Sequence, residues 1–187
     1  MRLRRLLLVG LLALPPLAVA GFAAAGSDNS ALSELRRATA AFHDPAAADA
    51  AGYTIELGDV FGETCIVDLA APSRGAMGVH LVNGGLLGDA VLDPAKPEAL
   101  VYEPRNDGTL KLVAAEYVVF QDAWDQANGF TGDTHAPPPE LFGRTFEFAD
   151  GSRFGVPAFW ALHAWAWKPN PSPLGGIFGA WNPRVSC

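Results

Sequence analysis

Three polar residues each stand alone in an apolar run, and their types are those that bind metals or transfer protons. His80 lies in the run AMGVHLV, Glu116 in LVAAEYVVF and His163 in FWALHAWAW. A polar group buried without a partner costs roughly 1–3 kcal/mol, so each of these side chains needs one. We therefore predict that the three side chains contact one another or a shared ligand.

Two imidazoles and one carboxylate form a donor set suited to a divalent transition metal such as Zn²⁺, Cu²⁺ or Fe²⁺. The leading hypothesis is a metal site made by His80, Glu116 and His163, with a coordination position that could stay open. The first alternative is a buried hydrogen-bonded network in which Glu116 accepts from the imidazoles, inside a non-enzymatic domain that binds a small molecule or a partner. The second is a metal-free pocket in which the trio serves as acid, base and orienting group.

The sequence assigns no reaction, and whether the chain is an enzyme stays open. The apolar runs lack H-E-x-x-H and G-x-S-x-G, and no P-loop or G-x-G-x-x-G occurs, so no nucleotide cofactor is expected. The other two histidines are expected to be exposed: His43 lies at the break between two expected helices, and His135 lies in a loop before a proline run.

The elements that position the trio are expected to be strands. Alternate side chains of a strand share a face, so each run places its polar group on one face with apolar neighbours. The tryptophan-rich run is also compatible with a short helix after Pro157. In strand form, Phe159, Ala161, Trp165 and Trp167 share the face of His163, and Leu112, Ala114, Val118 and Phe120 share that of Glu116.

The rest of the chain predicts an α+β fold. A helix is expected over Ser30–Phe42 with Ser30 as its cap, and a second helix should start at Asp44-Pro45 and stop at Gly52. From residue 53 onward, short apolar runs alternate with turn residues, which predicts a mostly antiparallel sheet that is curved or barrel-like. Hairpins are expected across Asn106-Asp107-Gly108 and across Asp150-Gly151.

Residues 1–25 have the pattern of a signal peptide. A basic start with Arg4 and Arg5 precedes an apolar stretch, and small residues then allow cleavage after Ala20 or Ala25. An uncleaved anchor is the alternative. We therefore expect a secreted or periplasmic protein with a single globular domain over residues 26–187.

Charge and cysteine content agree with export. Removal of the three n-region arginines leaves 10 Lys and Arg against 20 Asp and Glu, a net charge near −10. This disfavours nucleic acid and anionic membrane surfaces as partners, and it is compatible with a small-molecule ligand. In an oxidising compartment Cys65 and Cys187 would form a disulfide.

Three segments resemble a family of small exported bacterial proteins of unknown function. They are GAMGVH at residues 75–80, the stretch from Leu92-Asp93-Pro94 to Glu103-Pro104, and a C-terminal H-x-W-x-W motif followed by WNPRVSC. The resemblance implies a self-contained secreted domain. It implies no reaction, ligand or catalytic residue.

Overall fold

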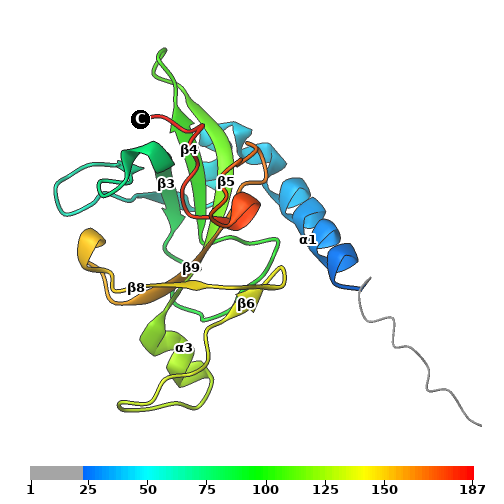
Figure 1. The fold of residues 1–187 in the computed structure, drawn as a ribbon, viewed down its shortest axis with the longest axis vertical. Helices are drawn as coiled ribbons and strands as arrows, with labels where there is room; N and C mark the ends of the chain where they lie inside the picture. Colours follow the sequence, from blue (N-terminus) through cyan, green and yellow to red (C-terminus); the bar gives the residue numbers. More distant parts are fainter. Residues whose placement is uncertain (1–22) are drawn as a thin grey trace, which may run out of the picture.

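The computed structural model describes residues 23–187, which form three α-helices and an open, mainly antiparallel sheet (Figure 1). The sheet has seven strands in the order β1-β3-β4-β5-β9-β8, with β2 also pairing with β3. The helices are α1 (Ala23–Thr39), α2 (Pro45–Ala50) and α3 (Gln121–Ala127). The sheet strands are β1 (Tyr53–Glu56), β2 (Cys65–Val67), β3 (Ala76–Asn83), β4 (Ala99–Pro104), β5 (Leu110–Phe120), β8 (Glu147–Ala149) and β9 (Phe159–Ala164). A separate pair is β6 (Glu140–Leu141) and β7 (Arg144–Thr145).

The α+β prediction is confirmed, but the expected barrel is wrong. Closure would require β8 at one edge to pair with β1 or β2 at the other, and these two strands pair only with β3. The edge strands are three or four residues long, so each offers few backbone groups for pairing with another strand. The sheet is therefore open, with two faces in different surroundings.

The N-terminal helices follow the sequence signals with one exception. Asp44 accepts a hydrogen bond from the Ala46 amide at 3.0 Å, Pro45 begins α2, and Gly52 ends this segment with a φ of 95°. The predicted cap at Ser30 is wrong, because Ser30 lies inside α1. The helix begins at Ala23 and continues through Gly26-Ser27-Asp28-Asn29, although these four residues have low helix propensity.

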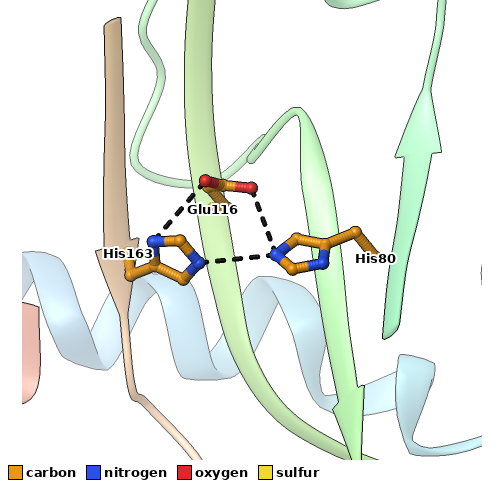
Figure 2. A group of neighbouring side chains, drawn as sticks. All are labelled: His80, Glu116 and His163. Carbon is orange, nitrogen blue, oxygen red and sulfur yellow. Dashed lines mark hydrogen bonds and ion pairs between the residues drawn. The ribbon is translucent and has the colours of Figure 1, made fainter. Parts of the chain in front are cut away.

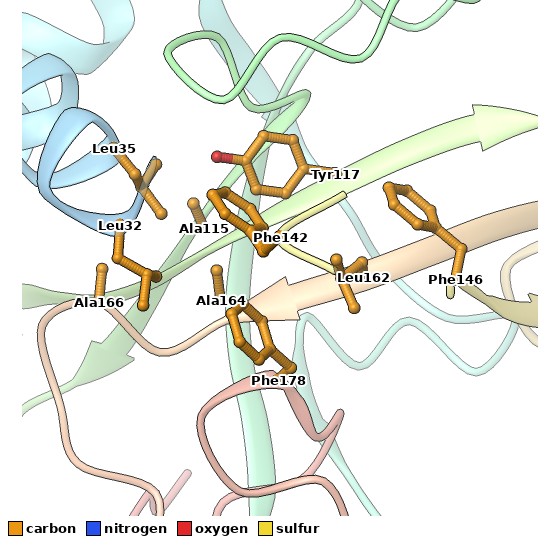
Figure 3. Close-up of a cluster of buried hydrophobic side chains, with 10 residues drawn as sticks. All are labelled: Leu32, Leu35, Ala115, Tyr117, Phe142, Phe146, Leu162, Ala164, Ala166 and Phe178. Atoms are coloured by element: carbon orange, nitrogen blue, oxygen red, sulfur yellow. The ribbon is translucent and has the colours of Figure 1, made fainter. Parts of the chain in front are cut away.

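One face of the sheet is closed by α1, whose Leu32 and Leu35 point onto β5 and β9 (Figure 3). Burial of each leucine contributes roughly 1.5–3 kcal/mol, which makes this face a dry core. Tyr102 continues the same face toward α2, and its hydroxyl donates at 2.7 Å to the carbonyl of Phe42, in the 3₁₀ turn that precedes α2. The cluster in Figure 3 comprises Leu32, Leu35, Ala115, Tyr117, Phe142, Phe146, Leu162, Ala164, Ala166 and Phe178.

The first predicted hairpin is confirmed and the second is wrong. β4 and β5 pair across a turn in which Asp107 accepts from the Thr109 amide and Gly108 takes a φ of 80°. After Asp150-Gly151 the chain instead forms a 3₁₀ turn over Ser152–Phe154, and β8 pairs with β9. Two glycines with positive φ, Gly151 and Gly155, flank this turn and divert the chain from a return strand.

Two local features change which residues share a face. β5 contains a bulge, since Val101 pairs with Ala114 but Tyr102 pairs with Leu112. The extra residue shifts Leu112 into the core cluster of Tyr102, so its predicted place on the face of Glu116 is wrong. β9 ends at Ala164, and the tryptophans that follow lie outside the strand.

The predicted disulfide joins Cys65 of β2 to Cys187, with a Cα–Cα distance of 5.7 Å. The tail also pairs with β3 through an antiparallel bridge between Ala76 and Asn182. The C-terminus is therefore held against the β2–β3 edge of the sheet (Figure 1). In the chain-entropy account a loop of this length stabilises the fold by roughly 4–5 kcal/mol.

The predicted signal segment lies almost entirely outside the described residues and stays a prediction, as does the domain boundary at residue 26. Within residues 23–187, no helix is both long enough and apolar enough to cross a membrane.

Candidate metal centre

Glu116 and His163 meet because their strands are neighbours in the sheet. Glu116 on β5 is the direct antiparallel partner of His163 on β9. Side chains opposed in this way have Cβ atoms about 4.5–5.5 Å apart, so they reach each other without any distortion of the backbone. The 46 residues between them in sequence conceal this contact.

His80 reaches the same point from β3, which is separated from β5 by β4. The β4 residue paired with Glu116 is Ala99, which is also paired with Val82 of β3. Ala99 lines the cavity described below, and its single methyl group leaves the space above β4 free. The imidazole of His80 can therefore extend across β4 toward Glu116.

The three side chains converge on the face of the sheet opposite α1 (Figure 2). The Nε2 atom of His80 lies 3.4 Å from Glu116 Oε2 and 3.4 Å from His163 Nε2. The Nδ1 atom of His163 lies 3.5 Å from Glu116 Oε1. All three residues are buried, and one ligand atom from each lies within 4.8 Å of the other two. The predicted convergence is confirmed, while metal ligation stays a prediction.

Burial shifts the acid–base equilibria of the trio toward neutral forms. It raises the pKa of Glu116 to about 8, with a smaller contribution from the negative charge of Glu98. Burial also lowers the pKa of His80 to about 4, and burial followed by repulsion from His80 lowers the pKa of His163 well below its ordinary value. Within the described chain no lysine or arginine pairs with Glu116; its nearest polar partners are the two histidines.

The Trp165 ring packs against the His163 ring. The two rings are stacked, with centroids 6.0 Å apart and planes 16° from parallel. The Trp165 indole is buried and donates to the Gly179 carbonyl at 2.6 Å, which ties it to the C-terminal tail. Packing of this kind restricts the rotamer of a ligand side chain.

The trio forms part of the wall of a cavity of about 260 Å³. Most other wall residues are aliphatic or aromatic and come from β1, β3, β4, β5, β8, β9, the loops between strands and the C-terminal tail. Glu147 is the one further acidic wall residue. Sequence reasoning missed the wall positions on β8, because Glu147 and Phe148 look like an ordinary short strand and only the pairing of β8 with β9 brings them here.

Neither of the remaining histidines joins this group. His43 is exposed, as expected, and its ring contacts the edge of Trp167 with centroids 4.4 Å apart. His135 is also exposed, as expected, but its Nδ1 lies 2.6 Å from the Oδ2 atom of Asp125, a pairing that sequence reasoning missed. Asp125 precedes His135 by ten residues on the other side of a loop, so no local spacing indicated the contact.

Comparisons with protein-family models, with curated proteins and with solved structures found no match to this chain. The resemblance of its three segments to a family of exported proteins therefore stays a prediction, and the functional argument depends on the geometry of the site.

Proposed function

We propose that this protein binds one divalent transition metal through His80, Glu116 and His163. The observation that carries the proposal is the spacing of the three donors. Hydrogen bonds between nitrogen and oxygen usually span about 2.7–3.2 Å. The His80 Nε2 atom lies 3.4 Å from both His163 Nε2 and Glu116 Oε2, which is wider than that. The other nitrogen of His163, Nδ1, lies 3.5 Å from Glu116 Oε1, which is also wider.

The same spacing suits donors around an ion. Zn²⁺ binds imidazole nitrogen at about 2.0–2.1 Å in a tetrahedral shell, which places two donors roughly 3.4 Å apart. The His80–His163 and His80–Glu116 separations both match this edge length. Two nitrogens and one oxygen suit Zn²⁺, Cu²⁺ and Fe²⁺, so the choice among these metals needs measurement.

Three protein donors leave a fourth tetrahedral position, and the trio borders a cavity on that face. An open position on a bound metal polarises a water molecule or accepts an oxygen-containing ligand. The residues of this chain would hold the ion and exclude bulk water from it, because the surrounding wall is largely apolar.

The test is metal analysis of protein purified without an affinity His-tag, then stripped and reloaded with Zn²⁺ or Co²⁺. We expect close to one equivalent of metal to remain after dialysis. Tetrahedral Co²⁺ coordination should also give strong visible absorption bands. Less than a tenth of an equivalent, with no such bands, contradicts the proposal.

A second candidate function is a non-enzymatic domain that binds a small molecule, with the trio as a structural network. The apolar walls of the cavity favour it, since small-molecule sites are largely apolar with a few polar groups. In that case His80→Ala and His163→Ala should lower the melting temperature and leave the low metal content unchanged.

We also propose that the protein functions after export. The Cys65–Cys187 disulfide supports this, because such bonds persist in oxidising compartments. N-terminal sequencing of the mature protein from fractionated cells should find a start at Gly21 or Gly26. A start at Met1 in the cytosolic fraction contradicts this proposal.

A further inference from the structure

The cavity beside the trio has one polar corner and otherwise apolar walls. His80, Glu116 and His163 form the corner. Val118, Phe120 and Phe159 are among the residues that form the apolar walls. A ligand that fills this space must therefore have a single polar end and an apolar body.

The rim of the cavity is also apolar. Ile55 on β1 is 49% exposed and Phe148 on β8 is 52% exposed, and both line the cavity. Large apolar side chains left in solvent around a cavity indicate a site for an apolar ligand. Glu147, the acidic wall residue, is exposed. Its carboxylate disfavours a ligand that carries another negative charge near the rim.

The charge of a loaded site sets the chemistry of the polar end. A divalent ion held by one carboxylate and two neutral imidazoles keeps a net charge of +1 in a largely apolar pocket. Such a charge is costly to bury unless an anion pairs with it. One anionic head group at the open coordination position would cancel it.

We infer that the cavity binds a monoanionic amphiphile, a medium-chain carboxylate, with its head on the metal and its tail along the apolar walls. This inference rests on the metal site proposed above. A cavity of about 150 Å³ binds benzene, roughly 25 Å³ per heavy atom, so a volume of about 260 Å³ accommodates roughly ten heavy atoms. Octanoate is of this size, so an eight-carbon acid is close to the size limit.

The experiment titrates the Co²⁺-loaded protein with octanoate, butanoate and octanol, using calorimetry and the visible Co²⁺ spectrum. Octanoate should bind and change the spectrum. Each buried methylene raises affinity by roughly three- to fourfold, so butanoate should bind at least tenfold more weakly. Octanol lacks the anionic head and should also bind at least tenfold more weakly.

Matched tryptophan substitutions test where the tail lies. Ala149 lines the cavity on β8, whereas Ala127 is exposed at the end of α3 and does not line it. The Ala149→Trp variant should keep its metal and lose octanoate affinity by at least tenfold. The Ala127→Trp variant should keep both.

The two proposals fail in different ways. A stripped and reloaded protein without metal overturns the metal site, and this inference with it, before any octanoate is added. A protein that holds one Co²⁺ but binds octanoate no better than butanoate, or without a spectral change, overturns the inference alone. So does unchanged octanoate affinity in Ala149→Trp.

Discussion

Two groups in this protein combine histidine with a carboxylate, and they differ in contact distance and in the direction of the carboxylate pKa shift. His135 and Asp125 form a short contact of 2.6 Å, with the imidazole 51% exposed. The hydrogen bond from His135 holds the pKa of Asp125 below its usual range. In the buried trio the contacts are 3.4–3.5 Å, and burial raises the pKa of Glu116 to about 8.

The comparison shows that spacing and burial decide what such groups can do. In the His135–Asp125 pair, the buried carboxylate accepts close hydrogen bonds from His135 and from the Ala136 amide, and the imidazole faces water. The buried trio is spaced too widely for close hydrogen bonds and is surrounded by apolar walls. Of the two groups, the trio alone has donors spaced widely enough for an ion between them. In its apolar surroundings a bound ion would be the largest local charge.

The largest effect is expected from substitutions that remove a histidine of the trio and leave the His135–Asp125 pair intact. His80→Ala and His163→Ala should each weaken metal binding by roughly a hundredfold or more, about 3 kcal/mol, because each removes a ligand. His135→Ala should change it less than twofold. Competition titrations with a chelator of known affinity measure all three. If His135→Ala lowered metal affinity equally, the proposal that only the trio binds metal would be contradicted.

Glu116→Gln tests whether the carboxylate is a ligand or only a hydrogen-bond acceptor. It keeps the size and an acceptor oxygen but removes the negative charge. Metal affinity should fall by roughly 10- to 100-fold, while the metal-free protein should unfold within about 1 kcal/mol of wild type. Affinity and chemical denaturation are measured on the same sample. A large loss of stability with unchanged affinity would favour the structural network.

In the His135–Asp125 pair, Asp125→Ala should act only locally. The Asp125 Oδ1 atom accepts from the Ala136 amide at 2.8 Å, and Ala136 is buried. Loss of that acceptor should speed hydrogen exchange at the Ala136 amide by roughly tenfold. Asp125→Asn retains an acceptor and should exchange more slowly than Asp125→Ala. Altered metal affinity in Asp125→Ala would contradict the separation of the two groups.

The smallest expected effect concerns a third carboxylate, Glu98, for which no described histidine is a partner. It tests whether burial alone can raise the pKa of a carboxyl group in this protein. Burial raises the pKa of Glu98 from 4.5 to about 8, although its Oε2 atom accepts from the Val118 amide at 3.0 Å. Between these pH values the unfolded chain releases a proton that the folded protein retains, so the free energy of unfolding falls as pH rises.

The Glu98→Gln variant does not titrate at this position, so it should match wild type near pH 5. At pH 9 it should be more stable, by on the order of 1 kcal/mol. Urea denaturation at both pH values measures the difference. An identical difference at the two values would mean that burial leaves the pKa of Glu98 unchanged.

Much of the fold could be predicted because its signals are local. The cap at Asp44 and the turn at Asp107-Gly108 depend on residues a few positions apart, and both predictions are confirmed. The turn at Asp150-Gly151 looked similar, but the positive-φ Gly155 supports a 3₁₀ turn there. The barrel was wrong because strand length and edge pairing are properties of the whole sheet.

The sequence by itself determined that His80, Glu116 and His163 would each be buried and in need of a partner, because a lone polar residue in an apolar strand has no other outcome. It could not determine that they would meet. That depends on the strand order β3-β4-β5-β9 and on the register that opposes Glu116 to His163. Pairing between distant strands is selected by packing of the entire core, which local residue patterns do not encode. Tertiary structure alone therefore decided the spacing of the donors and the cavity beside them.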